Sequence, residues 1–381
     1  MLCGSRSRGF KRRQECLRSM NFCEINLRIR GILCNFAADC WQPVGTVPLS
    51  VIFKSLIFTD FKVLDAAWPW FFIKVKMIKV NCKELDFIKM HGAGNDYVYV
   101  DCTGRYAPLM EQDVSGLARA VSDRHFGVGG DGLVLIGRGT DTDFRMRMFN
   151  NDGSEAQMCG NATRCIGKYV SDSGLTSKPV ITLRTLAGVK VLTLHRGSDG
   201  LVESVTVDMG VPVTEAKNVP AVCRDAVMKD FPLECGGREF RVTAVSMGNP
   251  HAVIFTDDLS DENVLHYGPL LERHPAFPEK ANIEFVRVKD HGHVEMRVWE
   301  RGTGETLACG TGACATAVAA AMNGLTDRSV EIELRGGTLS IGIADDGHVM
   351  MTGPAAITTY GKYLLPASLA TLDIPSSSSQ E

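Results

Sequence analysis

The chain has 381 residues, of which 45% are hydrophobic and 22% are charged. This length and composition are typical of a soluble enzyme that can bury the cores of two medium-sized domains. The 41 Lys and Arg residues are offset by 44 Asp and Glu residues, so no basic field for nucleic acid is predicted. The 13 cysteines are scattered and form no CxxC pair, which excludes a disulfide framework and a zinc ribbon and favours the reducing cytoplasm.

The first 76 residues differ from the rest of the chain. The opening thirty contain eight Lys or Arg residues against Glu15 and Glu24. An Arg-rich targeting segment is one interpretation; the one we favour is a non-core extension, 1–76, with the enzyme starting at Met77. The apolar stretch 63–73 contains Asp65 and Pro69 and is shorter than the roughly 20 residues that a bilayer requires, so no membrane span is predicted.

Strand-like runs dominate the rest of the chain, and several alternate apolar with polar residues, as half-buried strands do. The predicted strands cover 87–90, 97–100, 133–136, 144–149, 190–194, 240–245, 252–255, 283–288 and 294–299. Two helices are predicted, at 161–170 and 311–322. The second is rich in alanine and apolar on all sides, which is typical of a buried central helix.

The sequence also contains an internal repeat. Residues 146–160 align without a gap with residues 296–310, so that Cys159-Gly160 falls on Cys309-Gly310 at an offset of 150. Asn95 and Asn249, each after a glycine, are related by a similar offset. We therefore predict two similar halves, 77–205 and 206–366, that meet at a central cleft, followed by a disordered Ser-rich tail, 367–381.

Each half places a Cys-Gly pair at the start of its helix. Unsatisfied backbone N–H groups and the helix dipole favour negative charge there, so we predict a lowered thiol pKa. The same N–H groups can hold a substrate carboxylate. Because inverting a stereocentre needs a base on one face and an acid on the other, Cys159 and Cys309 are predicted as the catalytic pair of an amino-acid epimerase.

The alternative for any single cysteine is packing, because free cysteine is often buried. We assign that role to Cys165 and Cys314, which share no helical face with Cys159 and Cys309 for binding a metal. The glycine-rich runs that follow Gly160 and Gly310 lack the spacing of a nucleotide-binding loop. No cofactor site and no metal site are therefore predicted.

From Phe87 to about Gly361 the chain resembles the diaminopimelate epimerases. The resemblance depends on the segments 89–96, 151–155, 158–161, 246–251 and 300–314, together with Asn282. It implies interconversion of L,L- and meso-2,6-diaminopimelate without pyridoxal phosphate or metal, for lysine and peptidoglycan precursor biosynthesis. It also implies an α/β fold of two domains, each a curved, mostly antiparallel sheet around a central helix, and leaves a homodimer open.

The resemblance also assigns substrate contacts. Four are asparagines, whose amides can donate to a carboxylate and accept from an ammonium group: Asn95, Asn150, Asn249 and Asn282. Two are charged groups for the substrate's ends: Glu300 and Arg301. Four supply N–H groups at the helix starts: Gly160, Asn161, Gly310 and Thr311. For the asparagines the alternative is turn formation, and for the charged pair it is a solvated strand end.

This sequence departs from the family's usual pattern at two positions. Ala162 stands where many members have glycine, which a helix that has already begun tolerates, and Gly132 stands where many have glutamine. Two other functions stay open. A related two-cysteine racemase of the proline racemase type shares the expected fold, although those enzymes have His where this chain has Asn161. A thiol redox protein would use Cys159 and Cys309 as a switchable disulfide.

Overall fold

The computed structural model describes residues 83–374, so the predicted extension 1–76 lies outside the described residues. The first half of the sheet consists of seven strands in the order β1-β2-β3-β4-β6-β7-β8. Two of its pairings are parallel, β2 with β3 and β4 with β6, and the others are antiparallel. The strands are β1 (Glu84–Gly92), β2 (Asn95–Asp101), β3 (Gly132–Arg138), β4 (Phe144–Asn150), β6 (Val180–Thr185), β7 (Gly188–Arg196) and β8 (Val202–Asp208).

The second half repeats this order with β10-β11-β12-β13-β15-β16-β17. Again two pairings are parallel, β11 with β12 and β13 with β15, and they occupy the same places in the order. The strands are β10 (Arg238–Ser246), β11 (Pro250–Phe255), β12 (Asn282–Asp290), β13 (His293–Glu300), β15 (Ser329–Leu334), β16 (Gly337–Ile343) and β17 (Val349–Pro354). The internal repeat of the sequence is therefore a repeat of strand topology, and the predicted α/β fold of two similar halves is confirmed.

Short elements complete each half. A two-residue or three-residue strand pairs with the strand before each central helix, β5 (Glu155–Ala156) with β4 and β14 (Gly304–Thr306) with β13. The hairpin strand β9 (Phe231–Cys235) pairs with β10. The remaining helical segments are η1 (Ala107–Glu111), α4 (Ser115–Ser122), η2 (Ala216–Asn218), η3 (Glu262–Tyr267), α6 (Gly268–Glu272) and η4 (Ala367–Leu369).

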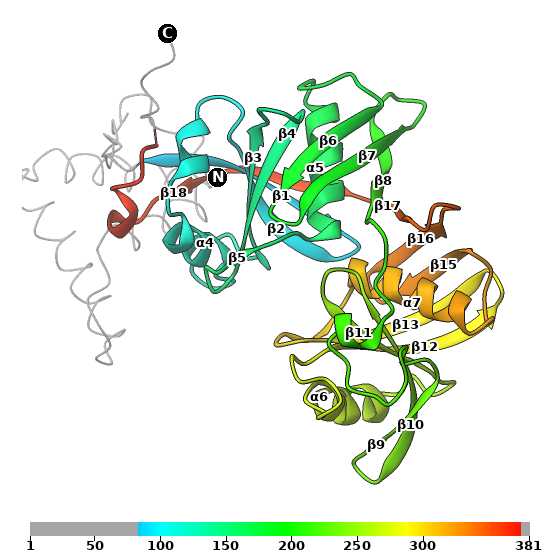
Figure 1. Ribbon diagram of the computed structural model, residues 1–381. Coiled ribbons are helices and arrows are strands. Elements are labelled where there is room, and N and C mark those ends of the chain that lie inside the picture. The colour runs from blue at the N-terminus through cyan, green and yellow to red at the C-terminus, as the bar shows by residue number, and fades with distance from the viewer. Residues whose placement is uncertain (1–82, 375–381) are drawn as a thin grey trace, which may run out of the picture. The chain divides into compact units, whose positions relative to one another are not determined.

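Two pairings join the halves into one sheet. Strand β17 pairs with β8 of the first half, from Met350 opposite Asp208 to Pro354 opposite Ser204. The last strand, β18 (Ala356–Leu364), then pairs with β1, and Figure 1 shows this red strand beside the blue one. The chain thus returns to the first half after completing the second.

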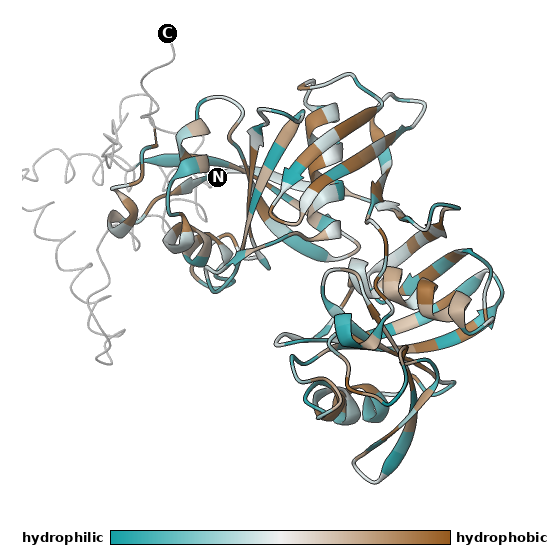
Figure 2. Cartoon of the chain, in the orientation of Figure 1, coloured by the Kyte–Doolittle hydropathy of each residue, from teal (hydrophilic) through white to brown (hydrophobic). Residues whose placement is uncertain are grey.

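Each half surrounds one long helix of 13 residues, α5 (Gly160–Asp172) or α7 (Gly310–Met322). Helix α5 packs on β1, β7 and β8, and α7 packs on β10, β11 and β16. Figure 2 shows α7 largely in apolar colours, as expected for a helix that is buried on nearly all sides. Both helices agree with the predicted ranges, 161–170 and 311–322.

Part of the predicted disordered tail packs against the core. Residues 367–374, the first part of the predicted tail, include η4 and bury Leu372 and Ile374 in the core beneath α4. Two apolar side chains near the end of a polar segment are sufficient to hold it against a hydrophobic surface. Within residues 83–374, no helix is long and apolar enough to cross a membrane.

Candidate active site

Cys159 stands directly before α5. Its backbone is extended, with φ −134° and ψ 125°, and its carbonyl accepts the N–H of Thr163 at 2.9 Å, which closes the first helical turn. Its Sγ donates to Asn95 Oδ1 at 3.3 Å. The thiol therefore lies at the start of the helix, as predicted, and points toward the start of β2.

Cys309 occupies the same place before α7. Its backbone is also extended, with φ −122° and ψ 110°, and its carbonyl accepts the N–H of Ala313 at 2.9 Å. Its Sγ accepts the N–H of Gly312 at 3.4 Å and lies 3.5 Å from Thr311 Oγ1. This thiol is held by its own helix, whereas the Cys159 thiol is held by a neighbouring strand.

The two helix starts lie close together. A side chain added at Gly160 would place its Cβ 2.6 Å from Met351 Cε, and one added at Gly310 would place it 3.1 Å from Met351 Sδ. Asn161 Nδ2 donates to the carbonyl of Ala308, the residue before Cys309, at 3.4 Å. Both glycines therefore pack against the same methionine of β17.

The thiol pKa values do not follow the prediction for helix starts. Burial raises the pKa of Cys159, although the N–H groups of Ala162 and Asn161 oppose the shift. Burial raises the pKa of Cys309 well above its usual value, and the carboxylates of Glu300 and Glu284 raise it further. The prediction of lowered thiol pKa values is therefore wrong, because burial disfavours the thiolate more than the N–H groups at the helix start favour it.

Asn95 and Asn161 form one network with Cys159. Asn95 Oδ1 accepts from Asn161 Nδ2 at 3.2 Å as well as from the thiol, and Asn95 Nδ2 donates to Asp131 Oδ2 at 2.6 Å. Asn161 is only 2% exposed, and its Oδ1 accepts from the guanidinium of Arg164 at 2.9 Å. Asp131 and Arg164 were not predicted as site residues, and their ordinary sequence contexts gave no signal.

The charge of Glu300 acts on both half-sites. Burial raises its pKa, while hydrogen bonds from Thr306 and Cys309 lower it. Its charge in turn raises the pKa of both Cys159 and Cys309. Among the predicted contacts, Glu300 is thus the residue that acts on both thiols.

A buried acid and histidine, which the sequence analysis did not select, stand behind Cys309. His251 Nδ1 lies 2.6 Å from Glu284 Oε1 and its Nε2 lies 3.0 Å from Asn249 Oδ1, with both His251 and Glu284 0% exposed. A glutamate between Ile283 and Phe285 in the predicted strand 283–288 was a signal that could have revealed this pair, because an isolated carboxylate is costly to bury.

The amide of Asn282 is used within the protein. Its Nδ2 donates to the carbonyl of Pro250 at 3.0 Å, and its Oδ1 accepts the backbone N–H of Arg301 at 2.9 Å. The exposed Arg301 guanidinium donates to the carbonyl of Glu279 at 3.0 Å. Asn282 therefore fixes the turn that carries Arg301.

Asn150 ends β4, and its Nδ2 donates to Ser154 Oγ at 3.0 Å. Among residues 83–374, Asn150 makes no hydrogen bond to the other predicted contacts, so the structure places it at a turn outside the network of Asn95, Asn161 and Cys159.

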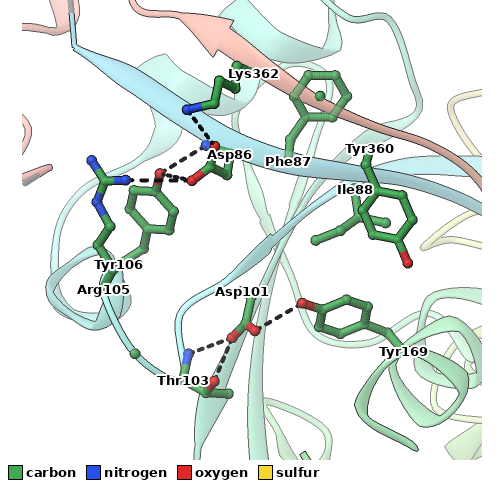
Figure 3. A pocket seen from close by; sticks show the side chains of 12 residues that line it. Asp86, Phe87, Ile88, Asp101, Thr103, Arg105, Tyr106, Tyr169, Tyr360 and Lys362 are labelled. Carbon is green, nitrogen blue, oxygen red and sulfur yellow. Dashed lines mark hydrogen bonds and ion pairs between the residues drawn. The ribbon is translucent and has the colours of Figure 1, made fainter. Parts of the chain in front are cut away.

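A separate hollow of about 600 Å³ lies between β1, β18, β2 and α5 (Figure 3) and contains none of the predicted site residues. Its carboxylates already have partners: Asp86 accepts from Tyr106 and pairs with Lys362, and Asp101 accepts from Tyr169 at 2.9 Å. We therefore place the candidate active site at the two cysteines and not in this hollow.

Comparison with solved structures defines the class of fold. The chain is similar to a hydroxyproline epimerase from Agrobacterium vitis, solved with bound trans-4-hydroxy-L-proline, with a TM-score of 0.55 and 16% identity over 74% of this chain and 93% of that one. It is also similar to a probable proline racemase from Agrobacterium radiobacter, with a TM-score of 0.54 and 15% identity over 75% of this chain and 94% of that one. The fold is therefore the one seen in these amino-acid epimerases and racemases.

Comparison of sequences gives the family. A model of the diaminopimelate epimerase family matches residues 87–215 and 243–358. The chain is 52% identical over 270 residues to the diaminopimelate epimerase of Acetivibrio thermocellus, covering 71% of this chain and 95% of that protein. It is 50% identical over 273 residues to that of Leptospira biflexa, covering 71% and 96%. The chain belongs to the diaminopimelate epimerase family.

Proposed function

We propose that this chain interconverts L,L- and meso-2,6-diaminopimelate in the cytoplasm, with Cys159 and Cys309 as the two proton-transferring groups and without a cofactor. The observation that carries the proposal is the pairing of two thiols at equivalent helix starts, which pack against the same Met351. The halves 77–205 and 206–366 would each supply one thiol.

The reaction needs one proton removed and one returned. The thiolate of one cysteine takes the α-proton and becomes a thiol, which leaves a carbanion at the α-carbon. The thiol of the other cysteine then gives its proton to the opposite face and becomes a thiolate, so that the two groups exchange roles. During the transfer, the N–H groups at Gly160, Asn161, Gly310 and Thr311 would hold the α-carboxylate as negative charge develops on it.

Burial raises both thiol pKa values, so proton removal requires a group that favours the thiolate. The substrate supplies one, because its α-ammonium group brings a positive charge next to the reacting carbon. An opposite charge nearby favours the ionised thiol. We therefore expect the reactive thiolate to form mainly when substrate is bound.

The distal end of diaminopimelate carries a second ammonium group and a second carboxylate. We propose Asn95, Asn150, Asn249 and Asn282 as its amide contacts, with Glu300 and Arg301 as its charged contacts. The bonds that Asn95 and Asn282 now make to Asp131 and to Arg301 support a role in which each amide both positions a neighbour and presents its remaining donor or acceptor.

The proposal is tested by incubating the purified chain in deuterated water with separate amino acids. Diaminopimelate, proline, hydroxyproline, glutamate and lysine form the panel, and mass spectrometry follows deuterium at the α-carbon. We expect incorporation with diaminopimelate alone. Incorporation with proline or hydroxyproline instead would favour the racemase alternative, and incorporation with none of the panel would favour a thiol redox protein.

A further inference from the structure

The two half-sites differ in buried charge although they share one topology. Arg164 follows Cys159 in α5 and is 0% exposed, whereas the residue at the repeat offset in α7 is the neutral Cys314. Glu284 in β12 is also 0% exposed, whereas the residue at the repeat offset in β3 is the apolar Val134. A buried cation is therefore found in one half and a buried anion in the other.

Arg164 is enclosed without a carboxylate partner among residues 83–374. Its Nη2 donates to Asn161 Oδ1 at 2.9 Å, its Nε to the carbonyl of Pro354 at 3.2 Å, and its Nη1 contacts Met351 Sδ at 3.5 Å. Two glycines leave room for it, since an added Cβ would lie 3.0 Å from Nη2 at Gly92 and 3.0 Å from Nε at Gly353. Because only neutral groups accept from the guanidinium, its charge stays available to other groups nearby.

The negative group that the Arg164 cation can stabilise is the Cys159 thiolate. Burial lowers the pKa of Arg164, and the thiols of Cys165 and Cys159 are the groups whose negative charge most opposes the shift. Cys165 is fully buried in the core and its own pKa is raised to about 11. Cys159 is the partly exposed thiol of the two, so it is the one that can meet substrate as a thiolate.

Glu284 has the opposite effect on Cys309. A Cβ added at Gly312 would lie 2.7 Å from Glu284 Oε1, so the carboxylate packs against Gly312. Gly312 is also the residue whose N–H donates to Cys309 Sγ. Glu284 Oε2 is buried with no hydrogen-bond partner among the described residues. The side chain that faces this carboxylate is His251, whose Nδ1 lies 2.6 Å from Oε1 and leaves Oε2 unbonded.

Glu300 disfavours the thiolate at both positions, and it also accepts a hydrogen bond from Cys309, so it does not favour ionisation of either thiol over burial. Tyr97 also faces Cys159 and is neutral in the working range, since burial raises its pKa well above the usual value. Arg164 and Glu284 are therefore the charged groups that act on one thiol each.

We propose that Cys159 is the first of the two thiols to lose its proton, so that, of the two singly ionised forms of the enzyme, the one with a Cys159 thiolate and a Cys309 thiol is the more populated. Arg164 and Glu284 are the positioning residues that set this order. The inference rests on the proposed two-thiol function and goes beyond it, because that function alone requires only that the two groups be in opposite states.

The test is alkylation of the full chain with iodoacetamide over a range of pH, with each cysteine followed by peptide mass spectrometry. The thiolate is the form that reacts, and the pH at half the maximal rate does not depend on how accessible the sulfur is. We expect the midpoint of Cys159 to lie about one pH unit or more below that of Cys309. Equal midpoints, or the reverse order, would overturn the proposal.

Two pairs of variants identify the cause. Glu284→Gln keeps the shape and should lower the midpoint of Cys309 while leaving that of Cys159 in place, with Glu284→Asp as the charge-preserving control. Arg164→Met should raise the midpoint of Cys159, and Arg164→Lys should keep it low. If Arg164→Met does not fold, Glu284→Gln still decides, because an unchanged gap between the midpoints in that variant contradicts the proposal.

Diaminopimelate epimerisation is measured on the same unmodified samples. A protein that epimerises the substrate but has no gap between its midpoints refutes the ordering and leaves the proposed function intact. A protein that has the gap but does not epimerise diaminopimelate refutes the proposed function instead.

Discussion

Replacing Asn161 by alanine removes the side chain that connects the two helix starts. Its amide donates to Asn95 Oδ1 at 3.2 Å and to the Ala308 carbonyl at 3.4 Å, and it accepts from the buried Arg164 at 2.9 Å. Two neutral hydrogen bonds and one to a charged group sum to about 3–5 kcal/mol when their partners stay buried and unpaired. We expect Asn161→Ala to lower the free energy of unfolding by about that amount.

Urea denaturation of the full chain, followed by far-ultraviolet circular dichroism, measures this loss. Asn150→Ala is the matched control, because Asn150 is also a predicted substrate contact but makes one bond to Ser154 Oγ at a turn. We expect that variant to change the free energy of unfolding by less than about 0.5 kcal/mol. A loss below about 1 kcal/mol in Asn161→Ala would refute the network described here.

Four other experiments test the two thiols, Arg301 and the extension 1–76. Cys159→Ser and Cys309→Ser should each lower turnover by about 10²–10⁴-fold with little change in melting temperature, because a hydroxyl is a much weaker acid than a thiol; retained turnover in either variant would argue against two thiols. Arg301→Lys should raise the Michaelis constant, since an ammonium cannot form the two-pronged bond to a carboxylate, and an unchanged constant would contradict that contact. Mild oxidation should inactivate the enzyme through a Cys159–Cys309 disulfide that dithiothreitol reverses and substrate prevents; peptide mapping that finds both thiols free would exclude it. Removing residues 1–76 should leave activity and melting temperature nearly unchanged, and a large loss of either would show that the extension stabilises the enzyme.

The sequence predicted the fold where a repeated local pattern was sufficient. The shared spacing to Cys159 and Cys309 located both central helices, and alternation of apolar residues located nine of the strands. The pairing of β18 with β1 could not be predicted in this way. It joins segments that are far apart in the sequence, and the local pattern of residues 356–364 does not predict which strand they pair with.

The sequence proposes residues for the candidate site, but it does not predict their pKa values. The helix start at Cys309 predicts a favourable environment for a thiolate, whereas the structure adds Glu284 and Glu300 and removes water, so that the pKa rises. Burial is a property of the assembled fold, and a charge from a distant strand has no signature beside the cysteine. For the same reason the sequence alone did not single out Arg164, whose importance depends on its having no carboxylate partner among residues 83–374.

Early-time deuterium incorporation tests whether two cysteines act on opposite faces of one carbon. Unlabelled L,L-diaminopimelate is added to the full chain in deuterated water, and the α-deuterium of both isomers is measured before a tenth of the substrate has reacted. We expect deuterium in the meso product and almost none in the recovered L,L-substrate, because the group that removes the proton is not the one that returns it. Deuterium that enters the recovered substrate as fast as the product would mean that one base serves both faces, and would refute the two-cysteine mechanism.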